Sequence, residues 1–119
     1  MNNSLELQLK KLGSNHPRIA IAKNTLGHTF KARGKILKSL ELFNQASEIY
    51  QKTIGENNPI NAIIYQNLGH AYYLIGNYQD SFISYNNALN IFTKVIGHEH
   101  PNTGFCYESL GTLQLDKSQ

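Results

Sequence analysis

Residues 55–96 read GENNPINAIIYQNLGHAYYLIGNYQDSFISYNNALNIFTKVI, and the 42 residues before them repeat the same pattern. Aligned without a gap, residues 13–54 and 55–96 share fifteen identities in 42 positions. Glycine and proline recur at this interval as Gly13, Gly55 and Gly97 and as Pro17, Pro59 and Pro101. A fixed period of 20 to 50 residues indicates stacked copies of one supersecondary unit. The chain is therefore predicted to be an array of repeats.

Each repeat is predicted to contain two helices. A proline suits the first turn of a helix, where its missing N–H would have no partner, so Pro59 begins one. Apolar residues then follow at spacings of three and four, which is typical of an amphipathic helix. Gly76 ends it, because glycine tolerates the left-handed conformation that closes a helix. The same reasoning along the chain predicts helices at 17–33, 36–53, 59–75, 78–95 and 101–116.

The two ends of the chain match halves of a repeat. Residues 3–12 align with the last part of a second helix, because Ser4, Leu7 and Leu12 fall over Ala46, Ile49 and Ile54. Residues 97–119 match a first helix. Since paired helices cannot bury both apolar faces alone, such units stack on their neighbours. We expect residues 1–119 to form one all-α array of about six antiparallel helices: a half-repeat at 3–12, repeats at 13–54 and 55–96, and a half-repeat at 97–119.

These repeats resemble the tetratricopeptide repeat, in the 42-residue form found in kinesin light chains. The motif residues that carry the resemblance are Leu68-Gly69, Tyr72, Gly76, Tyr78, Ser81, Tyr85 and Ala88, and in the first repeat Leu26-Gly27, Phe30, Gly34, Ile36, Ser39, Phe43 and Ala46. The linker from Lys94 to Pro101 also looks like the kinesin-light-chain type. Three features depart from the pattern: Gln114 stands at a usual aromatic position, Asn58 replaces a histidine, and the third repeat is incomplete. The resemblance implies a right-handed superhelix of α-helix pairs.

The resemblance also implies a function. In this family the first helices line a concave groove that holds a peptide or a partner's helix. Amide side chains can both donate to and accept from a peptide backbone, and aromatic side chains often dominate binding energy. The positions carried over to this chain are Asn24, His28, Lys31, Gln66, Asn67, His70, Tyr73, Phe105, Glu108 and Thr112. We therefore expect a non-enzymatic adaptor that binds a protein or peptide partner.

An alternative function is self-assembly. The last predicted helix is more apolar than the polar cap that a terminal repeat needs, because it carries Phe105, Cys106, Tyr107, Leu110, Leu113 and Leu115. Open half-repeats at the two ends could pair between chains and form a dimer, a ring or a filament. A longer parent array, or a last helix that serves as the cap, would explain the same composition. The sequence leaves these alternatives open.

Other classes of partner are disfavoured. A net charge of +3 comes from basic residues scattered over loops and second helices, and the 42-residue period differs from that of helical repeats that read nucleic acid. A clamp for a terminal carboxylate needs charged donors, but its expected positions hold Asn24, His28, Asn67, Phe105 and Ser109.

Catalysis, metal or cofactor binding and membrane insertion are disfavoured as well. No titratable cluster converges on a catalytic or metal site, so we expect no cofactor and no metal. The longest apolar run, Ala71–Ile75, is too short to cross a bilayer. Cys106 is the only cysteine and therefore fits a reducing compartment, which favours the cytoplasm.

Overall fold

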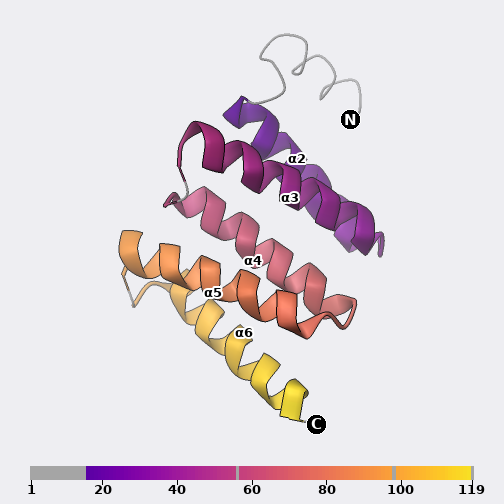
Figure 1. Ribbon diagram of the computed structural model, residues 1–119, viewed down its shortest axis with the longest axis vertical. Helices are drawn as coiled ribbons and strands as arrows, with labels where there is room; N and C mark the ends of the chain where they lie inside the picture. The colour runs from indigo at the N-terminus through magenta and orange to yellow at the C-terminus, as the bar shows by residue number, and fades with distance from the viewer. Residues whose placement is uncertain (1–15, 56, 98, 119) are drawn as a thin grey trace. The chain divides into compact units, whose positions relative to one another are not determined.

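The computed structural model describes residues 16–55, 57–97 and 99–118, with side chains through Leu113. These residues form five α-helices and no strand (Figure 1): α2 Pro17–Ala32, α3 Ile36–Thr53, α4 Pro59–Leu74, α5 Tyr78–Val95 and α6 Pro101–Ser118. The predicted helices agree with these bounds to within two residues at each end. The sixth predicted helix, at 3–12, and the side chains of Gln114 and Leu115 lie outside the described residues.

Each helix that starts with a proline is capped by the residue before it. Nδ1 of His16 accepts a hydrogen bond from the Arg18 amide at 3.1 Å, and Oδ1 of Asn58 accepts one from Ile60 at 2.8 Å. Nδ1 of His100 accepts one from the Asn102 amide at 3.1 Å. The three caps are 42 residues apart and satisfy amides that have no partner inside the helix. Asn58 is therefore a chemical equivalent of the two histidines.

The second helices end at glycines in the left-handed region. Gly55 has φ of 109° and Gly97 has φ of 86°. Their amides donate to the carbonyl oxygens of Tyr50 at 2.9 Å and Phe92 at 3.0 Å. These bonds satisfy carbonyls at the ends of α3 and α5 and turn the chain toward the next proline.

The chain divides into two compact units, Met1–Glu56 and Asn57–Gln119. In the first unit α2 packs against α3, and Gly27 faces the ring of Phe43 so closely that a Cβ there would lie 2.9 Å from Cε1. Ala20 and Ala46 are fully buried in the same unit. Glycine and alanine therefore allow the close approach of the two helices.

The second unit contains α4, α5 and α6. A Cβ at Gly69 would lie 2.8 Å from the Tyr85 ring, and Oγ of Ser81 donates to the Gly69 carbonyl at 2.6 Å. The third helix, α6, packs against α5. Cys106 of α6 is fully buried in one cluster with Ala62, Ala88, Ile91 and Phe92. The cysteine thus acts as a small apolar core residue.

Candidate partner-binding surface

A pocket opens in the second unit, where all three helices contribute side chains. Its volume is about 160 Å³. The residues that line it are His70 and Tyr73 of α4, Tyr85 of α5, and Phe105, Ser109, Thr112 and Leu113 of α6. Residues three and four positions apart share one face of a helix, which brings the α6 residues to a single wall.

The pocket has an apolar interior and a more polar rim. Tyr85 and Leu113 are 3% and 2% exposed and therefore form its inner wall. Phe105 is 48% exposed, and His70 and Thr112 are exposed at the rim. This distribution gives a hollow that can exclude water from an inserted group while its edge stays in contact with solvent.

Burial shapes the electrostatics of the inner wall. Desolvation raises the pKa of the Tyr85 hydroxyl above its ordinary value of 10.0, while its hydrogen bond with Ser109 acts in the opposite direction. The hydroxyl is therefore neutral at physiological pH. The ring of Tyr73, on the neighbouring helix, lies 5.5 Å from the ring of Tyr78, centroid to centroid. The aromatic wall of the pocket is thus held from two helices.

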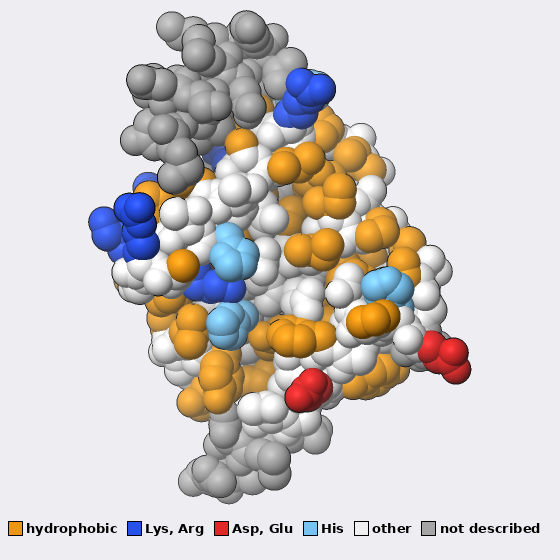
Figure 2. Space-filling view, turned by 180° about the vertical axis from the view of Figure 1, so that it is seen from behind, with side chains coloured by type: hydrophobic (Ala, Val, Ile, Leu, Met, Phe, Trp, Pro, Cys, Tyr) orange, Lys and Arg blue, Asp and Glu red, His pale blue; other side chains and the backbone are white. Residues whose placement is uncertain are grey.

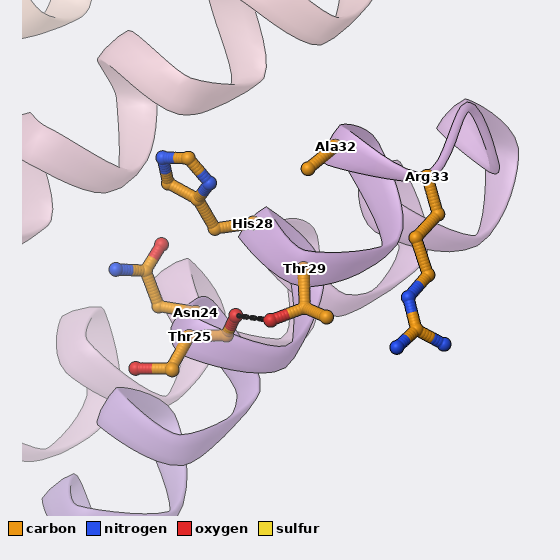
Figure 3. Close-up of a pocket in the computed structure, with 6 residues that line it drawn as sticks. All are labelled: Asn24, Thr25, His28, Thr29, Ala32 and Arg33. Carbon is orange, nitrogen blue, oxygen red and sulfur yellow. Dashed lines mark hydrogen bonds between the residues drawn. The ribbon is translucent and has the colours of Figure 1, made fainter.

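A second depression, of about 480 Å³, lies along α2 in the first unit (Figure 3). Asn24 and His28 point toward the same side of the helix, and Arg33 points away from them (Figure 3). Oγ1 of Thr29 donates to the carbonyl of Thr25 at 3.1 Å, so this threonine is tied to its own helix. Five of its six lining residues have polar side chains, which can form hydrogen bonds with a partner.

Comparisons with known proteins place the chain in a family. A sequence model described as the tetratricopeptide repeat matches residues 1–52, 20–84 and 60–119. The chain belongs to the tetratricopeptide repeat family. The resemblance noted in the sequence is thereby confirmed. No curated protein matches the chain.

Solved structures share the tetratricopeptide fold. Crystal structures of a candidate kinesin light chain of Podosopora anserina, with nearly identical TPR-like repeats, match at a TM-score of 0.88 and 24% identity, over 99% of this chain and 56% of that chain. The crystal structure of BtubC (BKLC) from P. vanneervenii matches at a TM-score of 0.79 and 24% identity, over 98% of this chain and 50% of that chain. The chain thus spans about half the length of these structures. They confirm the predicted all-α solenoid fold.

The predicted groove residues of this tetratricopeptide chain fall into three groups. His70, Tyr73, Phe105 and Thr112 meet at the pocket between α4, α5 and α6. Asn24 and His28 line the depression along α2. The remaining four, Lys31, Gln66, Asn67 and Glu108, line neither hollow.

Sequence reasoning missed part of the pocket lining. Tyr85 is one of the motif residues of the second repeat, and it was not among the predicted groove positions. Ser109 drew attention only as a position that lacks the charge of a carboxylate clamp. The equivalence of Leu113 to the buried Ala71, 42 residues earlier, was the available signal for a buried wall residue.

Several hydrophobic side chains are exposed on the face seen in Figure 2, where they are mixed with polar groups and histidines. The exposed hydrophobic residues of the first helices include Ile21, Ile63, Leu74 and Phe105. Within residues 16–55, 57–97 and 99–118, no three His, Cys, Asp or Glu side chains are grouped to hold a metal ion. The described helices include none that is long and apolar enough to span a membrane.

Proposed function

We propose that this chain binds a segment of a partner protein and that the pocket between α4, α5 and α6 holds one apolar side chain of that segment. Tetratricopeptide repeats are protein-interaction modules, and the proposal gives this module a specific anchor point. The observation that carries it is the pocket itself, to which four predicted groove residues, on two first helices, contribute side chains.

The size of the pocket supports an apolar anchor. A cavity of roughly 150 Å³ lined by apolar side chains can hold benzene. The pocket of about 160 Å³ is thus large enough for the side chain of leucine or phenylalanine. Its inner wall is formed by Tyr85 and Leu113, and half-buried Tyr73 lines the pocket beside them. These side chains suit an apolar group and leave a charged one poorly solvated.

Polar groups around the pocket would hold the rest of the segment. His70 and Thr112 lie at its rim and can form hydrogen bonds with a peptide backbone. Gln66 and Asn67 lie one turn earlier on α4 and are half-buried, so their amides could extend this set. The free thiol of Cys106 is buried in α6, one of the helices that line the pocket. A free thiol is typical of a reducing compartment such as the cytoplasm.

A peptide library selection tests the proposal. Peptides selected for binding to the wild-type chain are expected to share one large apolar residue, and the dissociation constant of the best peptide is then measured by fluorescence polarisation. Phe105→Ala should weaken binding at least about tenfold, because anchors of this kind are worth more than 1.4 kcal/mol.

Tyr107→Ala is the matched control. Tyr107 lies on the same helix and is 49% exposed, nearly the same as the 48% of Phe105, but it does not line the pocket. The control variant should bind the selected peptide as tightly as the wild-type chain. Equal affinities for all three chains, or failure to select any peptide, would contradict the proposal.

A further inference from the structure

A carboxylate stands beside the pocket of the second unit. Glu108 of α6 lies three residues after Phe105 and four before Thr112, which both line the pocket, so the three side chains share one face of the helix. Oγ1 of Thr112 donates to the Glu108 backbone carbonyl at 3.1 Å, and the Glu108 side chain is exposed. Its carboxylate is therefore at the edge of the pocket, next to the exposed rim.

Few charges surround this carboxylate in its own unit. Glu108 is the only Asp, Glu, Lys or Arg among the described side chains of α4 and α6, and no ion pair between described side chains involves it. The basic residue of α5, Lys94, is nine residues from Tyr85, or roughly 13 Å along the helix. Asp80 is only five residues from Tyr85 and has the same sign as Glu108.

The end of α4 adds negative potential at the same place. Tyr73 lines the pocket and lies in the last turn of α4, where the aligned peptide dipoles create a partial negative charge. The last turns of α2, α3 and α5 each contain a lysine, whereas the last turn of α4 contains no basic residue. The pocket therefore lies between a carboxylate and the negative end of a helix that no lysine of its own compensates.

The unit that contains the pocket is acidic, although the whole chain is basic. Residues Asn57–Gln119 include four acidic and two basic side chains, whereas Met1–Glu56 includes nine basic and four acidic ones. Complementary charge speeds the encounter of two surfaces and disfavours partners of the wrong sign. The charge of this unit therefore favours a basic segment over an acidic one.

The carboxylate also replaces an amide of the other first helices. At intervals of 42 residues, Glu108 of α6 stands where α4 has Gln66 and α2 has Asn24. An amide can donate and accept hydrogen bonds, but an ionised carboxylate only accepts them. It forms its strongest hydrogen bonds with positively charged donors. Of these three positions, the one beside the pocket is thus the one that selects a cation.

We propose that the segment whose apolar side chain fills the pocket also carries a lysine or arginine near that residue, and that this cation pairs with Glu108. The inference rests on the proposed function, because it assigns the chemistry of the same bound segment. At the rim the cation stays in contact with water and avoids the cost of a buried charge. The ring of Phe105, which is 48% exposed, offers it an aromatic face as well.

Peptide pools with a fixed phenylalanine test the proposal. Each pool contains peptides of about twelve residues with phenylalanine at the centre, and lysine, serine or glutamate fixed at one of the three positions on either side. The other positions hold random uncharged residues. By fluorescence polarisation, the wild-type chain should bind the lysine pool at least about threefold more tightly than the serine pool for one or more positions, as expected of an exposed ion pair. The glutamate pool should bind most weakly.

Variants of the carboxylate assign the preference to one residue. Glu108→Gln should make the lysine and serine pools bind equally, and Glu108→Lys should make the glutamate pool the tightest. Glu99→Gln is the matched control, because Glu99 is an exposed acidic residue of the same unit that does not line the pocket. This variant should keep the preference for lysine. Raising the salt concentration from about 0.05 M to about 1 M should remove most of the preference, because exposed charges are screened.

The outcomes separate this inference from the proposed function. If all pools bound equally well and Phe105→Ala weakened them all, the cation would be wrong and the apolar anchor would stand. A preference for lysine that survived in Glu108→Gln, or that Glu99→Gln removed equally, would overturn the pairing with Glu108. Failure of every pool to bind would overturn both proposals.

Discussion

At the scale of single residues, Gly69 and Gly111 have equivalent positions and opposite surroundings. A methyl group at Gly69 would lie 2.8 Å from the buried ring of Tyr85, so Gly69→Ala should lower the free energy of unfolding by about 1–3 kcal/mol. Gly111→Ala meets no described neighbour and should raise it by about 0.5–1 kcal/mol, because alanine is the better helix former. Denaturant unfolding measures both values.

The pair of variants serves as its own control, because the chemical change is identical and both glycines are inside helices. If Gly111→Ala destabilised the chain as much as Gly69→Ala, a neighbour that meets the added methyl group would have to cover Gly111.

The thiol of Cys106 should make stability fall in alkaline solution. Burial raises its pKa from 9.0 to about 11. Between these values the unfolded chain has lost the thiol proton while the folded chain retains it, so the free energy of unfolding falls as pH rises. The full loss is about 2.7 kcal/mol at 1.36 kcal/mol for each tenfold change. Denaturant unfolding between pH 8 and pH 11.5 measures the decline.

Cys106→Ala isolates this contribution. Burial also lowers the pKa of Lys31, which raises stability with pH, and raises the pKa values of Tyr50 and Tyr85, which lower it. The contributions of Lys31 and Tyr50 are common to both chains, whereas Cys106 itself helps to raise the pKa of Tyr85, so that part of the Tyr85 contribution disappears with the thiol. The difference in free energy of unfolding between wild type and Cys106→Ala should therefore narrow from pH 8 to pH 11. A constant difference would mean that folding does not raise the pKa of the thiol.

At the scale of the helix, the cap of one repeat predicts the effect of a substitution at the cap of another. His100→Ala removes the Nδ1 acceptor of the Asn102 amide and should destabilise the chain by about 1 kcal/mol. His100→Asn should be nearly neutral, because Asn58 already caps α4 at the equivalent position. Thermal unfolding of the two variants checks this. Equal losses would mean that the imidazole contributes by packing rather than by capping.

The helices were largely predictable because their ends are determined locally. Proline with its preceding cap begins α2, α4 and α6, and glycine in the left-handed region follows α3 and α5. Each signal lies within a few residues of the boundary that it sets. The differences of one or two residues fall at the C-terminal ends of the first helices, where methods of assignment commonly differ by this much. Even there, Gly34 and Gly76 lie in the left-handed region two residues after the last residue of α2 and α4.

At the scale of the whole molecule, the candidate site was predictable only in part. The resemblance to the tetratricopeptide repeat predicts that Tyr73 and Phe105 face the groove, but it does not indicate how deep the surface between two helices is. That depth depends on Tyr85 and Leu113, which belong to the packing between helices rather than to a face. The pocket therefore required the packed structure.

The division into two units predicts where a local defect spreads. Gly27→Ala and Gly69→Ala introduce matched clashes, with Phe43 inside the first unit and with Tyr85 inside the second. In repeat proteins stability is roughly a sum of the contributions of each repeat and its neighbours. Hydrogen exchange should thus show lost protection mainly in α2 and α3 for Gly27→Ala, and mainly in α4 to α6 for Gly69→Ala. If both variants lost protection equally in all five helices, the chain would instead unfold as a single cooperative body, and the destabilisation at one glycine would be shared by the whole molecule.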